Sequence, residues 1–389
     1  MRDGADSASL SGFPSGGSCR ETRLMRGSRS QNGVGAAAPE AFETDTCVSY
    51  PSSPACGGTF PQGGRLQIRR SAAIVGSTAS GKSALALAAA KTLGGEIISV
   101  DSMQVYRKMD IGTAKPTAAE RAAVPHHMID ICDPETPYSC ADFAVGALHC
   151  AAEITARGNL PIFCGGTGLY LDSVLRGGAP DETAADEGLR ASLADFLREN
   201  GAHALHERLR EVDPESADSI HENNTKRVIR ALEVALVSGK PKSAWDKESR
   251  EKKPALDLVT VGLFYHDRSL LYRRIERRVD EMLAAGLLEE TERLLRDGVF
   301  ETNATAAGAI GYKELLGALT GKERLDEAVE RLKTATRRYA KRQVTWFSAK
   351  PYVLPLWCDD GEGREKPFET ILSECLALFS ANGVGQNEK

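Results

Sequence analysis

The chain has 389 residues, of which 41% are hydrophobic and 26% charged, and its formal net charge is −5 at pH 7. This is the composition of a globular protein with two domains, or with one domain that carries a large insertion. The small net charge excludes a global basic field, so a nucleic-acid partner would have to be held by local basic patches.

The nine cysteines lie at irregular spacings without a Cys-x-x-Cys pair, which argues against a zinc module and a disulfide framework. No apolar run reaches the length of a membrane span, and no charged start followed by an apolar stretch marks a secretory signal. We therefore predict a protein of the reducing cytoplasm with no membrane partner.

Residues 1–67 are rich in Ser, Gly, Pro and Ala and have no sustained hydrophobic period, so we predict a disordered N-terminal extension. Scattered arginines leave a targeting role open, although acidic residues such as Asp3 and Glu21 do not suit it. An over-extended start of the reading frame is a further alternative.

The first motif of the folded part is GSTASGKS, from Gly76 to Ser83, directly after the apolar run 72–75. It fits the phosphate-loop pattern G-x-x-x-x-G-K-S/T. A buried strand would lead into a turn whose backbone N–H groups converge on an anion, and a helix over 82–93 would add its positive end. Lys82 would reach the outer phosphate, and the Ser83 hydroxyl would lie where Mg²⁺ needs a ligand.

The alternative is a chance match in a chain rich in Gly and Ser. The strand-like run before the motif and the helix-like run after it disfavour that alternative. The motif alone leaves the ligand open, because such loops bind ATP, GTP or other diphosphates.

A second buried strand is predicted over 96–100, and it ends on Asp101 in the segment DSMQVY. A carboxylate is thus placed beside the crevice where α/β sheets bind ligands. Asp101 could organise Mg²⁺ as a Walker B residue. With Gln104 it could instead hold the edge of a base and take up its proton. The structural alternative is an Asp that caps the next turn.

Strands and helices alternate further along the chain. We predict a short strand over 125–131, a helix over 138–157 with Ser139 as N-cap, and a strand over 160–164. The GGTGLY segment that follows permits close approach at Gly165 and Gly166, with a plain αL turn as the alternative. The alternation predicts an α/β fold, a P-loop NTPase-like doubly wound parallel sheet.

Residues 182–255 show helix after helix without strand signals, and we predict a helical insertion domain there. The catalytic core would then comprise 68–181 and 256–358, with a strand over 258–264, charged helices over 269–296 and 326–348, and a last strand over 352–357. Residues 359–389 would form a C-terminal helix and tail.

Basic residues gather in two helical clusters and in the insertion. The first cluster is Arg268, Arg273, Arg274, Arg277 and Arg278, in which Arg274 and Arg278 share one helix face. The second, with Tyr339, Trp346 and Phe347 interleaved as in a surface that also packs or stacks, is Arg331, Lys333, Arg337, Arg338, Lys341 and Arg342. Solvated helix faces are the alternative interpretation. The adjacent His126 and His127 would point to opposite sides, which disfavours a metal site.

In this order, the motifs closely resemble those of the bacterial tRNA dimethylallyltransferases, the tRNA isopentenyltransferase family. The resemblance covers roughly residues 72–347 and rests on GSTASGKS, DSMQVYRKMDIGTAKP, DPETPYSCADF, GGTGLYL, NNTKRVIRALEV, AIGYKEL and TRRYAKRQVTWF. Ser77 stands where the family commonly has proline, and Ser83 replaces a common threonine while keeping the hydroxyl. Residues 1–67 have no counterpart in the family pattern.

The resemblance implies transfer of a dimethylallyl group from dimethylallyl diphosphate to N6 of the adenosine 3′ of the anticodon, in tRNAs that read codons beginning with U. The partners would be the tRNA anticodon stem-loop, dimethylallyl diphosphate and Mg²⁺, and the protein would be a monomer. The phosphate loop would hold departing pyrophosphate, with nucleotide or ATP binding left open.

The family's functional residues carry over onto matching positions. Asp101 would be the general base, Thr78 and Lys82 would contact the diphosphate, Arg278 would neutralise the leaving group, and Ser83 would lie near Mg²⁺. The whole diphosphate loop would be Gly76, Ser77, Thr78, Ala79, Ser80, Gly81, Lys82 and Ser83. The residues that would contact tRNA are Asp101, Ser102, Met103, Gln104, Thr167, Arg190, Lys226, Arg227 and Arg230.

Three rival functions were weighed against this one: a small-molecule kinase, prenylation of a free adenine nucleotide, and RNA binding without catalysis. A small acceptor would need neither the helical insertion nor its basic residues. An RNA-binding protein without catalysis would not need a carboxylate at a strand end beside a phosphate loop.

Overall fold

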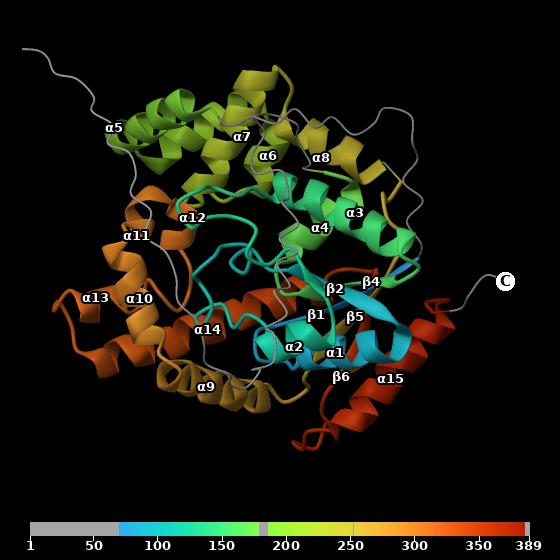
Figure 1. Cartoon of the computed structure of the whole chain (residues 1–389). Helices are drawn as coiled ribbons and strands as arrows, with labels where there is room; N and C mark the ends of the chain where they lie inside the picture. The colour runs from blue at the N-terminus through green and yellow to red at the C-terminus, as the bar shows by residue number, and fades with distance from the viewer. Residues whose placement is uncertain (1–69, 179–185, 252, 386–389) are drawn as a thin grey trace, which may run out of the picture. The chain divides into compact units, whose positions relative to one another are not determined.

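Six parallel strands form one sheet in the order β3-β2-β4-β1-β5-β6. The computed structural model describes residues 70–178, 186–251 and 253–385, and Figure 1 shows their arrangement. The strands are β1 Ser71–Gly76, β2 Gly95–Val100, β3 His126–His127, β4 Leu160–Gly165, β5 Leu258–Phe264 and β6 Val353–Trp357. The predicted α/β fold with a parallel sheet is therefore confirmed.

Helices cover both faces of this sheet. The central strand β1 is therefore buried on both sides, and its residues alternate between two cores. Ala73 and Val75 pack in the core that includes α3 and α4, whereas Ala72 and Ile74 pack in the core that includes α1 and α15. The bounds of these helices are α1 Lys82–Leu93, α3 Cys140–Ala156, α4 Gly168–Arg176 and α15 Phe368–Ala381. The carboxyl ends of β1, β2 and β4 are thereby held side by side.

The N-cap predicted at Ser139 is present, as a capping box with Asp142. The strand predicted over 125–131 is wrong beyond His127, because Met128 and Asp130 have positive φ of 62° and 57° and turn the chain. A short helix, α2 Ala118–Ala123, precedes this segment.

The plain αL turn considered for GGTGLY is wrong, since neither Gly165 nor Gly166 has positive φ. A Cβ on Gly165 would lie 2.0 Å from the carbonyl oxygen of Val100, and one on Gly166 would lie 2.2 Å from Nε2 of Gln343. Glycine is required here for close approach, which was the other interpretation.

The helical insertion has its own small core, to which Leu193, Leu205, Leu209, Val228 and Leu232 contribute. Its helices are α5 Glu187–Val212, kinked at Gly201, α6 Pro214–Ser219, α7 Thr225–Ser238 and α8 Lys242–Glu251. No strand occurs between residues 186 and 251, as predicted. The boundary predicted at 181/182 and the extension predicted over 1–67 lie outside the described residues.

The helical stretch predicted over 269–296 breaks at Gly286, whose φ is 102°. The helices of the C-terminal half are α9 Arg268–Ala284, α10 Leu287–Arg296, α11 Val299–Thr302, α12 Ala304–Ala307, α13 Leu316–Leu319 and α14 Leu325–Ser348. Within the described ranges, none of the helices is both long and apolar enough to span a membrane.

Candidate active site

The phosphate loop joins the end of β1 to the start of α1, as predicted. Gly81 has φ of 95°, and Ala79 has φ of 61°, a left-handed conformation that is strained for an alanine. Arg274 of α9 stabilises this apex, because its Nε donates to the carbonyl oxygen of Ala79 at 2.8 Å and its Nη1 pairs with Glu365. The buried hydroxyls of Ser77 and Ser80 have no hydrogen-bond partner within the described part of the chain.

Two partly exposed cations, Lys82 and Arg278, lie close enough to the partly exposed carboxylate of Asp101 beside this loop to interact with it electrostatically. Burial and then the charge of Arg278 lower the pKa of Lys82, whose Nζ donates to the carbonyl oxygen of Ser77 at 3.2 Å. Burial also lowers the pKa of Arg278, and its Nε lacks a hydrogen-bond partner among the described residues. Burial raises the pKa of Asp101, although Lys82 and Arg278 oppose that shift. The local excess of positive charge would suit an anion.

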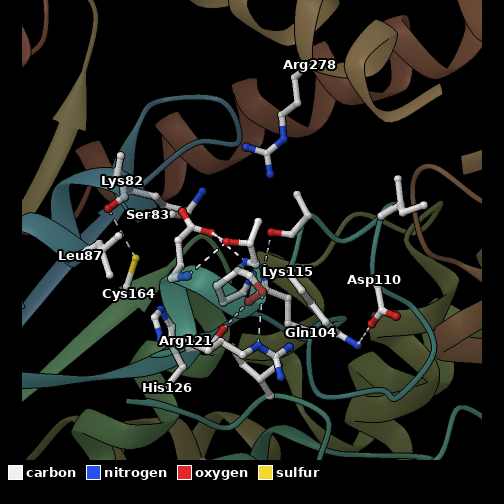
Figure 2. A pocket seen from close by; sticks show the side chains of 18 of the residues that line it. Lys82, Ser83, Leu87, Gln104, Asp110, Lys115, Arg121, His126, Cys164 and Arg278 are labelled. Carbon is white, nitrogen blue, oxygen red and sulfur yellow. Dashed lines mark hydrogen bonds and ion pairs between the residues drawn. The ribbon is translucent and has the colours of Figure 1, made fainter. Parts of the chain in front are cut away.

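Two cavities meet at these residues. The larger has a volume of about 910 Å³ and the smaller about 290 Å³, and Lys82, Ser83, Gln104, Arg278 and Met282 line both. Figure 2 shows Lys82, Ser83 and Arg278 around the cavity with Cys164 at the end of β4. The smaller cavity is also lined by Thr78, Asp101, Ser102, Met103, Thr113, Tyr339 and Arg342. Two ligands could therefore reach the same anion site from separate cavities.

Asp101 also caps the turn that follows β2. Its Oδ1 accepts hydrogen bonds from the backbone N–H groups of Met103, at 2.9 Å, and Gln104, at 3.4 Å. The structural alternative, an Asp that caps the turn, is thus confirmed. It does not remove the carboxylate from the cavity, since Asp101 lines the cavity's wall.

The side-chain amide of Gln104 is engaged within the protein. Its Oε1 accepts from Ser99 Oγ at 2.8 Å, and its Nε2 donates to the carbonyl oxygens of Thr113, at 3.1 Å, and Ala114, at 3.2 Å. Holding the edge of a base would require exchange of these bonds, and that role stays a prediction. The hydroxyl of Thr167 accepts the N–H of Ser102 at 3.1 Å and so supports the same turn.

In the insertion, Arg190 and Arg230 bind one buried carboxylate. Their ion pairs with Glu233 measure 2.8 Å and 2.7 Å. Burial opposes the charge of Glu233, but the hydrogen bonds from Arg230, the Asp186 N–H and Arg190 hold its pKa below the ordinary value. Lys226 and Arg227 are exposed. The four basic residues predicted to contact tRNA thus separate into two that pair with buried Glu233 and two that are exposed, Lys226 and Arg227.

The aromatic residues interleaved in the second basic cluster mainly pack, which is one of the two roles predicted for them. Phe347 is buried in the core, Trp346 packs against Gly168, and half-buried Tyr339 lines the smaller cavity. In the second basic cluster, Arg331 pairs with Glu323, Lys333 with Asp280 and Arg337 with Glu276. Half of that cluster therefore stabilises α14 against acidic neighbours.

Gln343 is a site residue that the sequence did not reveal. On α14, its Oε1 accepts the N–H of Thr78 at 2.8 Å and its Nε2 donates to the carbonyl oxygen of Gly166 at 2.9 Å. It thereby ties the phosphate loop to the glycine pair. Its place in the motif TRRYAKRQVTWF was the only signal in the sequence.

A protein-family model described as IPP transferase matches residues 104–350, more than half of the chain, and one described as isopentenyl transferase matches residues 70–129. The chain belongs to the IPP transferase family. The tRNA dimethylallyltransferase 1 of Pelobacter propionicus is 47% identical over 306 residues, which is 79% of this chain and 96% of that protein. The tRNA dimethylallyltransferase of Geobacillus thermodenitrificans is 50% identical over 274 residues, 70% of this chain and 86% of that protein.

Solved structures of this IPP transferase fold resemble the chain as well. The tRNA isopentenylpyrophosphate transferase of Bacillus halodurans aligns with a TM-score of 0.59 and 42% identity, over 80% of this chain and 96% of that one. A eukaryotic dimethylallyltransferase acting on tRNA aligns with a TM-score of 0.65 and 29% identity, over 82% of this chain and 81% of that one.

Proposed function

We propose that this chain is a tRNA dimethylallyltransferase, which transfers the dimethylallyl group of dimethylallyl diphosphate to N6 of the adenosine 3′ of the anticodon in tRNAs that read codons beginning with U. The observation that carries this proposal is that Asp101, on the wall of the smaller cavity, lies within electrostatic range of Lys82 and Arg278, which line both cavities. Family membership supports the same reaction class.

In this reaction, the bond between the allylic carbon and the diphosphate oxygen breaks, and a bond from N6 to that carbon forms. The N6 proton passes to Asp101, and pyrophosphate leaves. An adenine amine is a poor nucleophile, so negative charge builds on the leaving group before the new bond is complete. Lys82 and Arg278 would stabilise that charge, and the raised pKa of Asp101 suits proton uptake.

Ser83 fits a Mg²⁺ ion at the leaving group, because its exposed hydroxyl lines both cavities at the start of α1. Mg²⁺ is usually held by one or two protein oxygens together with water and substrate phosphates. Bound there, the ion would neutralise part of the charge of the pyrophosphate.

The acceptor adenosine would occupy the smaller cavity, next to Asp101, Tyr339 and Arg342. A base reaches such a pocket only when it is unstacked, and an unpaired anticodon loop permits this at less cost than a duplex does. The proposal further includes a cytoplasmic location and a monomeric state.

Purified protein incubated with labelled dimethylallyl diphosphate and Mg²⁺ is expected to label unmodified tRNA. Digestion of the product should place the label on N6 of the adenosine 3′ of the anticodon. Label on free AMP alone, or ATP hydrolysis without labelled tRNA, would contradict the proposal in favour of the rival functions.

The basic residues of the insertion give a second test. Lys226→Ala and Arg227→Ala should weaken tRNA binding and reduce the salt slope by about one per residue, with Tm unchanged, because both side chains are exposed. Arg190→Ala should cost about 1–3 kcal/mol of stability, because it removes a hydrogen-bonded partner of buried Glu233. Equal Tm values for all three variants would contradict the distinction between exposed Lys226 and Arg227 and the stabilising ion pair of Arg190.

A further inference from the structure

Glu290 of α10 is a buried carboxylate that lines neither cavity, and its partners are backbone N–H groups and a hydroxyl. It accepts the backbone N–H groups of Asp110 at 3.1 Å, Ile111 at 3.0 Å and Gly112 at 3.0 Å. The hydroxyl of Tyr312 donates to the same carboxylate at 2.7 Å. Within the described part of the chain no Lys, Arg or His forms an ion pair with it. Three successive N–H groups and one hydroxyl therefore offset the cost of burying this charge.

The loop that Glu290 holds forms a wall of both cavities. Gly112 and Thr113 line the smaller cavity, whereas Asp110, Ile111, Ala114 and Lys115 line the larger one. Figure 2 shows Asp110 and Lys115 next to Gln104 on that wall. The loop is packed tightly on its outer side, since a Cβ on Gly112 would lie 2.5 Å from the Tyr312 ring.

A short series of hydrogen bonds connects this loop to Asp101. The carbonyl oxygens of Thr113 and Ala114 accept from Nε2 of Gln104. The N–H groups of Gln104 and Met103 in turn donate to Oδ1 of Asp101. The position of the 110–114 loop therefore fixes Gln104 from one side, and Gln104 belongs to the turn that Asp101 caps.

We propose that Glu290 is a positioning residue for prenyl transfer, which sets the 110–114 loop and, through Gln104, the orientation of Asp101. The proposal rests on the proposed function for its kinetic test but not for its structural one. Glu290→Gln is the direct variant: an amide has one acceptor oxygen, so its NH₂ group must face an N–H donor of the loop. Glu289, the exposed neighbour on the same helix, provides the matched control.

Glu290→Gln is expected to lower kcat about 10- to 100-fold, with KM for dimethylallyl diphosphate within about threefold of wild type, because misplacement of the base affects the transition state more than binding. Glu289→Gln should match wild type. In a Gln104→Met background, which already lacks the bonds to Thr113 and Ala114, the effect of Glu290→Gln should shrink to about threefold or less. Tyr312→Phe removes one hydrogen-bond donor and keeps the charge of Glu290, so it should show a smaller decrease in kcat. This variant replaces Glu290→Gln as the test if Glu290→Gln does not fold.

Hydrogen exchange tests the same series of hydrogen bonds without the enzymatic reaction. In Glu290→Gln, exchange should increase at residues 110–112 and also at 103–104. Wild-type kcat in Glu290→Gln and Tyr312→Phe, an undiminished loss in the Gln104→Met background, or faster exchange confined to 110–112 would overturn the proposal. If wild-type protein prenylates no tRNA, the proposed function fails, and the exchange result decides the role of Glu290 by itself.

Discussion

Asp101→Ala is expected to lower kcat for tRNA prenylation by roughly 10²–10⁴-fold, the usual contribution of a general base. Its carboxylate is the acidic group on the wall of the smaller cavity, and burial raises its pKa, which suits uptake of a proton from an amine. Binding of tRNA, measured by filter retention or fluorescence anisotropy, should stay near wild type because exposed basic residues such as Lys226 and Arg227, which the variant leaves intact, would supply most of the affinity for the phosphate backbone.

The control for this variant is Asp297→Asn, which changes an exposed carboxylate paired with Lys108 and should keep wild-type kcat. A general base acts only when deprotonated, so kcat/KM of the wild-type enzyme, which reports the free enzyme, should fall as the pH drops through the pKa of Asp101. Since that pKa is raised, the fall should begin above the ordinary pKa of aspartate. Turnover of Asp101→Ala near the wild-type level would remove this residue from the role of base.

Arg278→Met should lower kcat by roughly 10²–10³-fold, because it removes a half-buried cation from the place where, in the proposed reaction, charge develops on pyrophosphate. The apolar stem is nearly preserved, so the packing of α9 should change little. KM for dimethylallyl diphosphate should rise much less than kcat falls, since charge on the leaving group is greatest in the transition state.

Arg273→Met is the matched control on the same helix. Its guanidinium is exposed and hydrogen-bonded to Ser269, so its loss should alter kcat less than about twofold, as is usual for a surface change. If both variants lose activity equally, or if Arg278→Met raises only KM, the role of Arg278 at the leaving group is contradicted. Single-turnover kinetics separate the two effects.

The sequence predicted the parallel sheet because buried strands and capped helices are local patterns. The run 72–75 leading into GSTASGKS, and Ser139 three residues before Asp142, identify their elements within short windows. The same windows placed Lys82 at the start of the helix after one strand and Asp101 at the end of another, but did not place the strand β4 between these two strands. The family motifs supplied Arg278 as well.

What the sequence did not reveal depends on contacts between distant segments. The strand beyond His127 fails because Asp130 turns back to donate to the carbonyl oxygen of Gln104. The second basic cluster looked like a binding surface, but its acidic partners Asp280 and Glu276 lie on another helix. The loop around Gly112 and the carboxylate of Glu290 are 178 positions apart. No local sequence pattern predicts a contact between two segments so far apart in the chain.

The link through Gln343 has a consequence for how the enzyme is made. This side chain bonds the N–H of Thr78, 265 positions earlier in the chain, and the carbonyl of Gly166, 177 positions earlier. The phosphate loop therefore lacks one of its supports until α14 has left the ribosome and packed beside β1. A nascent chain arrested before residue 325 would carry the complete GSTASGKS motif without this support. The affinity of the phosphate loop for pyrophosphate should accordingly reach its final value only near the end of synthesis.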